Sequence, residues 1–203
     1  MDKKYLEEEI TALSARDAIR YRPMLHFASC FEEQTLDAFP LEALCPALDE
    51  HIEGNCSHIT ITLHEDAFTV QYNSGISLQK NTEGLTNLER ILTQIYTCSN
   101  LKKHLSVGEE FCKMGMAAIN FVSTKMECTT VWEEQKGVFI LEEGLLISKE
   151  ITPAKGIASW TSLYIKPDPS IFGDLPITLA GVQKRVAALR VQYPTLEVVV
   201  EQK

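Results

Sequence analysis

The sequence predicts an α+β fold, a two-layer sandwich in which helices cover one face of a mixed, mostly antiparallel sheet. Residues 58–63 alternate apolar side chains with polar ones, which is typical of a strand with one buried face. Residues 179–193 instead repeat apolar side chains every three or four positions, which indicates an amphipathic helix. Helices precede most of the strands along the chain, an order typical of this fold class. The 203 residues fit one large domain, expected over residues 13–203 after an arm of residues 1–12.

The first helices are predicted by capping residues, glycine and proline. Ser14 can cap the free amides of a helix that Pro23 ends. A second helix is expected over residues 37–54, with Gly54 as its stop. Pro46 lies inside it, and an interior proline removes a hydrogen bond and costs about 3 kcal/mol. We therefore expect a kink or a restart of the helix at this position.

The middle of the chain contains a second strand signal and one clear capping box. Residues 68–72 again alternate apolar and polar side chains, so a strand is expected there. Thr86 and Glu89 have the spacing of a capping box that opens a helix. Residues 98–112 show no periodicity and are expected to form a loop, and a short helix over 113–122 follows.

The C-terminal part of the chain is predicted to complete the sheet. A turn is expected over residues 133–137, with Gly137 at its end. The last helix should stop at Pro194. Strands are expected at residues 126–132, 138–141, 159–165 and 196–200.

Composition narrows the classes of partner. The net charge of −9 disfavours binding to duplex nucleic acid, since that affinity comes from lysine and arginine displacing counterions. The N-terminus is charged where a signal peptide needs an apolar core, and no apolar run reaches the ~20 residues that span a bilayer. The six cysteines include no C-x-x-C pair. We expect a cytoplasmic protein with reduced thiols and neither a membrane nor a direct nucleic-acid partner.

Four cationic residues are compatible with a local basic stripe or with a solvated helix face, and we favour the second interpretation: Lys166, Lys184, Arg185 and Arg190.

Common catalytic motifs are missing from the sequence. There is no G-x-S-x-G, no H-E-x-x-H and no G-x-x-x-x-G-K-[ST]. The five histidines are scattered, and His58 and His64 lie at opposite ends of one expected strand, where they cannot easily share a metal. The residues alone therefore favour a binding or scaffolding protein over an enzyme.

Five short strings resemble, in the same order, the ATPase domain of type II topoisomerase B subunits. The first, LSARDAIRYRP, is similar to the opening AIRKRPGMYIG of that domain, and WTSLYIKPDPSIF is similar to GTTVTFKPDPEIF. The five strings lie at residues 13–23, 49–63, 92–96, 107–115 and 160–172. Because they span nearly the whole chain, the protein resembles the gyrase-B-like branch of the GHKL ATPases. The resemblance implies a Bergerat fold.

The resemblance also implies four ATP-binding motifs, of which the first is altered here. It supplies a glutamate that activates the attacking water and an asparagine that holds Mg²⁺. Glu42 falls at the glutamate position and Pro46 at the asparagine position. Proline has no side-chain oxygen for a cation that needs oxygen ligands. Cys45 replaces a neighbouring aspartate. Glu42 is either a retained general base or an ordinary solvated helix residue, and we favour the second interpretation.

The second motif corresponds to residues 72–77. Tyr72 stands where the family has the aspartate that contacts adenine, and Asn73 is its nearest polar substitute. Gly75 and Ile76 are retained. Gly75 is as compatible with a tight turn as with ligand binding.

The third and fourth motifs are also reduced. The glycine-rich lid becomes a string that keeps Gly115 alone and carries Glu109 and Glu110 near the expected phosphates. One like-charge contact at ~4 Å costs about 4 kcal/mol at an effective dielectric of ~20. Gly115 is equally compatible with a turn. The fourth motif keeps Thr161, which is also an ordinary strand residue, but replaces the family's glycine with Trp160.

The resemblance leads to a primary hypothesis and two alternatives. The primary one is a degenerate, stand-alone and non-catalytic gyrase-B-like domain that acts through a protein partner, a second copy or a ligand other than ATP, with no cofactor. The first alternative is a divergent GHKL ATPase that binds ATP and Mg²⁺, with Glu42 as base and Thr161 on the phosphates. The second alternative is a thiol-based sensor, because Cys45 and Cys112 fall at pocket positions.

Overall fold

The computed structural model describes residues 12–95, 97 and 112–203, and within them it contains one seven-stranded sheet. The strand order is β5-β4-β3-β6-β2-β1-β7, and β1 and β7 run parallel while every other neighbouring pair is antiparallel. The expected mixed, mostly antiparallel sheet is therefore confirmed. The strands are β1 (His58–Leu63), β2 (Phe68–Tyr72), β3 (Ser123–Trp132), β4 (Gln135–Glu142), β5 (Leu145–Pro153), β6 (Trp160–Pro167) and β7 (Glu197–Gln202).

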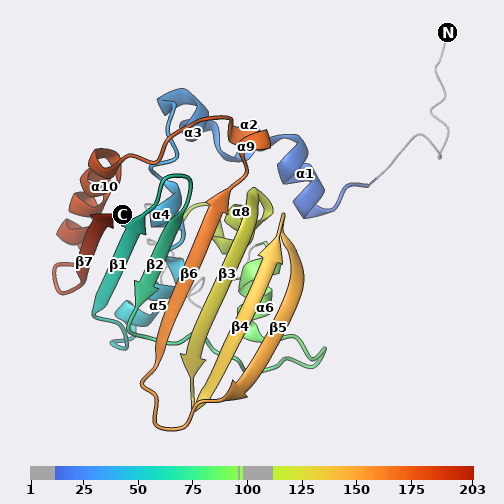
Figure 1. Ribbon diagram of the computed structural model, residues 1–203, viewed down its shortest axis with the longest axis vertical. Coiled ribbons are helices and arrows are strands. Elements are labelled where there is room, and N and C mark those ends of the chain that lie inside the picture. Colours follow the sequence, from blue (N-terminus) through green and yellow to red (C-terminus); the bar gives the residue numbers. More distant parts are fainter. Residues whose placement is uncertain (1–11, 96, 98–111) are drawn as a thin grey trace.

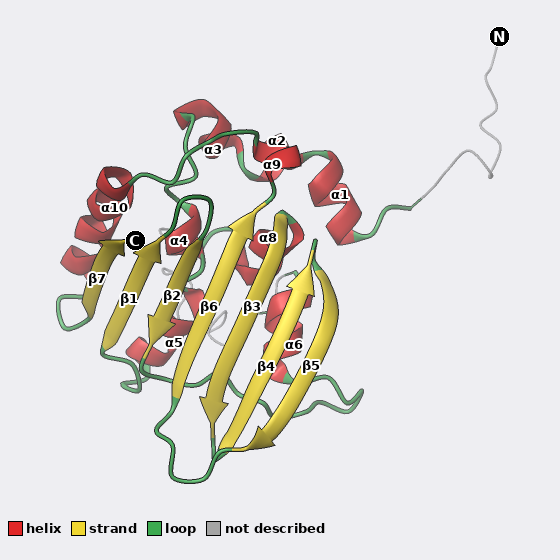
Figure 2. Cartoon of the chain, in the orientation of Figure 1, coloured by secondary structure: helices red, strands yellow, loops and turns green. Residues whose placement is uncertain are grey.

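The helices lie mainly on one side of this sheet. Figures 1 and 2 show α4, α5, α6 and α8 behind it, α10 beside β7, and the described helices α1, α2, α3 and α9 along one end. The opposite face, turned toward the viewer, has no described helix over it, so the two-layer α+β architecture is confirmed (Figure 2). The bounds are α1 (Ala15–Tyr21), α2 (Pro23–His26), α3 (Ala28–Glu33), α4 (Phe39–Glu42), α5 (Cys45–Ile52), α6 (Asn87–Thr93), α8 (Gly115–Phe121), α9 (Pro169–Phe172) and α10 (Leu179–Gln192).

Local signals in the sequence are confirmed at several element ends. Ser14 accepts a hydrogen bond from the Asp17 amide and caps α1. Thr86 and Glu89 form a capping box in which each side chain bonds the other's backbone amide, which fixes the start of α6. The expected helix over 37–54 is broken after Glu42 and restarts at Cys45, so that Pro46 lies in the first turn of α5, where a missing amide hydrogen removes no helical bond.

Other expectations are wrong in detail. The turn after β3 consists of Glu133 and Glu134, both in the left-handed region, and not of residues 133–137. Gly137 instead pairs with Thr130 inside the sheet. The strand β5 and the short helices α2 and α3 are not expected from the sequence. Of the arm predicted over residues 1–12 and the loop predicted over 98–112, residues 1–11 and 98–111, with Glu109 and Glu110, lie outside the described residues.

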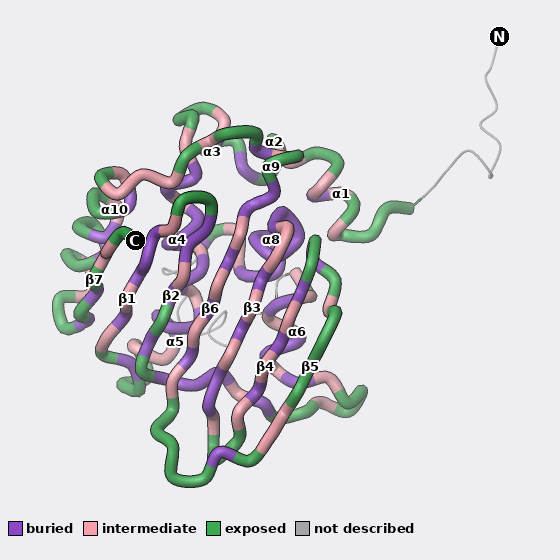
Figure 3. Tube along the Cα trace, viewed as in Figure 1, coloured by how far each residue is buried: buried purple, intermediate pink, exposed green. Residues whose placement is uncertain are grey.

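The hydrophobic core lies between the helices and the covered face of the sheet (Figure 3). Phe39 from α4, Phe68 from β2 and Phe139 from β4 are among its largest fully buried side chains. None of the described helices is long and apolar enough to cross a membrane. The motif positions of the resemblance lie along this layer boundary, on α4, α5, the end of β2, the start of α8 and β6.

Candidate functional site

Tyr72 occupies the position at which the resemblance expects an adenine-contacting aspartate. It is the last residue of β2, it is buried, and it stands opposite Thr161 of β6 in the sheet register. Burial raises the pKa of its phenol well above the ordinary value of 10.0. By hydrogen-bond geometry its hydroxyl has no partner among the described residues, although the Thr161 side chain is near enough to oppose the rise in the pKa. A large neutral ring thus fills a position where a carboxylate acceptor would be needed.

Thr161 uses its hydroxyl within the protein. Its Oγ1 donates to the carbonyl oxygen of Ser74 at 2.8 Å and lies 2.8 Å from Oγ1 of Thr130. Thr130 in turn accepts a hydrogen bond of 2.9 Å from the amide of Ile76. This chain of bonds fastens residues 74–76 to β3 and β6. Sequence reasoning missed Thr130, although its place on the covered face of β3 marks it as a buried polar residue that needs a partner.

Gly75 is required for packing against the sheet. A Cβ atom at this position would overlap the carbonyl oxygen of Val131 and crowd Cβ of Trp132. Only glycine allows the backbone to approach β3 so closely. Its retention therefore has a sufficient structural reason.

Asn73 is exposed and is held by the start of β1. Its Oδ1 accepts hydrogen bonds from the amides of Ser57 and His58, both at 3.0 Å, and its Nδ2 donates to the Ser57 hydroxyl at 3.0 Å. These bonds close the end of the β1–β2 pair. Its amide is therefore already committed to the fold.

Glu42, the last residue of α4, binds the segment that opens α8. Its Oε2 accepts a hydrogen bond of 2.8 Å from the Met114 amide. Burial raises the pKa of the Glu42 carboxyl above 4.5, against the opposing effects of the backbone amides of residues 113–115 and of the Lys113 charge. The interpretation of Glu42 as a solvated helix residue is therefore wrong. A general base must reach the proton that it removes, and one oxygen of this carboxylate is already engaged.

The remaining motif positions supply no ligand for a cation. Pro46 is buried in the first turn of α5 and has no side-chain oxygen. Gly115 has φ = 76°, and an added Cβ would meet nothing within 4 Å, so backbone conformation alone accounts for glycine there. Within the described part of the chain, no group of three or more His, Cys, Asp or Glu residues could hold a metal ion.

The two cysteines of the thiol hypothesis lie in segments that follow or contact α4. Cys45 is half-buried at the start of α5. Cys112 is buried, has φ = 58°, and its Sγ lies 3.8 Å from the carbonyl oxygen of Leu41. Together with the Met114 amide, this contact holds the start of α8 against α4.

The residues present do not fit ATP and Mg²⁺ in the way that the resemblance implies. The acceptor for the adenine amino group is replaced by the Tyr72 ring, and the oxygen ligand of the cation is replaced by Pro46. Thr161 and Glu42 remain in place but bond other parts of the chain.

The chain is similar in sequence to the DNA gyrase B subunits of several bacteria. It is 25% identical to the Rickettsia typhi protein over 198 residues, which is 93% of this chain and 24% of that relative. It is 24% identical to the Thermotoga maritima protein over 204 residues, or 97% of this chain and 31% of the relative. The Synechocystis protein is 27% identical over 176 residues, or 84% of this chain and 16% of the relative.

The similarity covers most of this chain but only part of each relative. No protein-family model matches it. It spans less than a third of the length of these three curated relatives. Nevertheless, the match covers most of the chain in each case, which agrees with the order of motifs in the sequence. The chain is thus similar, over most of its length, to one part of the DNA gyrase B subunit.

Proposed function

We propose that this chain is a non-catalytic, gyrase-B-like domain that acts by binding another protein. One observation carries the proposal: Glu42, Asn73 and Thr161, the polar side chains present at the motif positions, all form hydrogen bonds within the chain. A nucleotide would have to break these bonds before it could use the same groups. Burying a polar group without a partner costs about 1–3 kcal/mol, so each displaced bond weakens binding further.

The open face of the sheet supports a protein partner over a nucleic acid. By strand register this face carries Glu127, Glu150 and Glu201. Of its lysines, Lys125 is paired with Glu127 and Lys166 with Asp66. Two of the three strand lysines that register places on this face are thus paired with a carboxylate, Lys136 being the third, on a chain whose net charge is −9.

The cations of the last helix are partly engaged in the same way. Arg185 forms an ion pair with Glu33, and Arg190 donates to the carbonyl oxygen of Val198. These bonds favour the solvated helix face over a basic stripe that would bind nucleic acid.

The test is calorimetric titration with the non-hydrolysable ATP analogue AMP-PNP and Mg²⁺, with the DNA gyrase B ATPase domain as positive control. We expect no binding tighter than about 1 mM, a free energy of about −4 kcal/mol. A dissociation constant in the micromolar range contradicts the proposal.

The alternative, a divergent ATPase, is favoured by one observation, the raised pKa of Glu42, because perturbed carboxyl groups are frequent at active sites. Phosphate release by the wild type that Glu42→Gln abolishes would establish this alternative. Equal background release by both proteins would remove it.

A further inference from the structure

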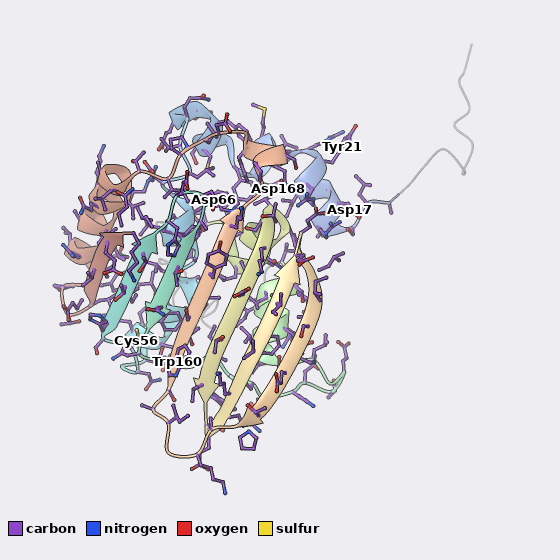
Figure 4. All side chains as sticks on the ribbon, in the orientation of Figure 1. Asp17, Tyr21, Cys56, Asp66, Trp160 and Asp168 are labelled. Atoms are coloured by element: carbon purple, nitrogen blue, oxygen red, sulfur yellow. The ribbon has the colours of Figure 1, made fainter. Side chains whose placement is uncertain are left out.

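The outer surface of α1 and α2 exposes large apolar side chains side by side. Tyr21, Met24 and Leu25 are 75%, 64% and 72% exposed. Helix α2 buries none of its four residues, although two of them are apolar. Figure 4 shows Tyr21 at the outer edge of the molecule. Single exposed apolar residues are common, whereas apolar residues that form one patch indicate an interaction site.

This surface is held rigidly from the inner side. Ile19 of α1 is buried, and Arg20 donates to the carbonyl oxygen of Phe121 at 2.8 Å and to Asp168 at 2.6 Å. Phe27, directly after α2, is buried with its ring centroid 5.4 Å from that of Phe39. The outward side chains therefore stand on fixed backbone, and a preorganised surface loses less entropy when a partner binds.

The surface of α1 and α2 is locally positive, because their one carboxylate, Asp17, is paired with Arg16. Residues 18–31 contain no aspartate or glutamate, whereas the chain has a net charge of −9. Arg22 and His26 are exposed, and neither forms an ion pair or side-chain hydrogen bond with another described residue. Tyrosine, methionine and arginine are also the residue types enriched in the buried centres of protein interfaces.

We propose that Tyr21, Arg22, Met24 and Leu25 form a docking surface for an acidic amphipathic segment of another protein. The partner's apolar side chains cover Tyr21, Met24 and Leu25, and a carboxylate pairs with Arg22. This inference deepens the proposed function, on which it rests, by naming the chemistry of the partner. A second copy is a poorer occupant, since the same surface on that copy has no carboxylate in residues 18–31 to pair with Arg22.

The test uses a phage-displayed library of helical peptides in which acidic, basic and uncharged amphipathic sequences are equally represented. Selected peptides are then titrated against the wild type, the triple variant Tyr21→Ser/Met24→Ser/Leu25→Ser, and Arg22→Glu. Val191→Ser is the matched control, because Val191 is 85% exposed on α10, away from this surface. All substituted side chains are exposed, so the variants should fold, which circular dichroism verifies.

We expect acidic amphipathic peptides to be selected, with affinity lowered at least about tenfold by the triple variant and by Arg22→Glu, and unchanged by Val191→Ser. Selection of basic peptides, of none, or of peptides indifferent to these variants overturns the inference. So does a wild-type dimer in sedimentation that the triple variant dissociates, or binding to phosphatidylserine vesicles that it abolishes. These measurements do not depend on AMP-PNP binding. The proposal of a docking surface can therefore be refuted while the proposal of a non-catalytic function stands, and the reverse.

Discussion

Replacing Glu42 by alanine and by glutamine measures how the carboxylate is used. Alanine removes the acceptor that the Met114 amide reaches at 2.8 Å and leaves that amide without its partner. An unsatisfied buried donor costs about 1–3 kcal/mol, so we expect Glu42→Ala to lower the free energy of unfolding by that amount. Glutamine keeps an amide oxygen at the same place and should retain most of the stability near pH 4. Urea unfolding monitored by circular dichroism measures both variants.

The dependence on pH adds a second, independent readout for Glu42. Burial raises the pKa of the folded carboxyl above its ordinary value of 4.5, so the folded chain holds the proton more tightly than the unfolded chain. The stability that this contributes is fully present below pH 4.5 and is lost as the pH rises through the folded pKa. Because glutamine does not titrate, Glu42→Gln should gain stability relative to the wild type across that window.

Two outcomes would refute this account of Glu42. If alanine leaves the free energy of unfolding unchanged, the carboxylate does not hold the start of α8 and is available for other chemistry. If the difference between wild type and Glu42→Gln does not change with pH, the carboxyl titrates as it does in the unfolded chain. The exposed Glu32→Gln substitution is the control, and its effect should stay within about 0.5 kcal/mol.

Two further substitutions test the buried polar groups around the site. Tyr72→Phe removes a hydroxyl that has no partner by hydrogen-bond geometry among the described residues. The free energy of unfolding should therefore stay equal or rise by about 1 kcal/mol. A clear decrease in urea unfolding would show that the hydroxyl does form a hydrogen bond. Arg20→Ala leaves the buried Asp168 without its guanidinium partner and should lower the free energy of unfolding by about 3 kcal/mol. The control Arg22→Ala should change this free energy little. Equal decreases for both variants would contradict a stabilising role of the ion pair.

The strands that alternate cleanly could be predicted from the sequence, and those at the edge could not. Residues 58–63 and 68–72 form β1 and β2 with the expected bounds, because one face of each is buried and the other is polar. β5 is an edge strand with mostly exposed residues, so its sequence lacks that alternation. Gly137 suggests a turn, but a Cβ in β4 would overlap the side-chain ends of Phe139 and Leu78, which would have to shift.

The candidate site shows a second limit of sequence reasoning. The motif order located Glu42, Tyr72 and Thr161 on neighbouring parts of the fold, yet it could not reveal what each side chain bonds. The Met114 amide and the Thr130 hydroxyl are distant in sequence from the groups they bind, by 72 and 31 positions. Such partners follow only from the packing of α8 on α4 and of β3 on β6.

Hydrogen bonding also decides which similarities to gyrase B are informative about nucleotide binding. Thr161 and Gly75 are needed by the fold, one as a buried donor and the other for close backbone approach, so their presence indicates nothing about ATP. The Tyr72 ring also has a structural role. Burying an aromatic side chain contributes about 1.5–3 kcal/mol, which offsets a hydroxyl without a partner, so the position stabilises the covered layer without any ligand. The positions that are informative about ATP are therefore Tyr72 and Pro46, where the chemistry differs, and both differences disfavour nucleotide binding.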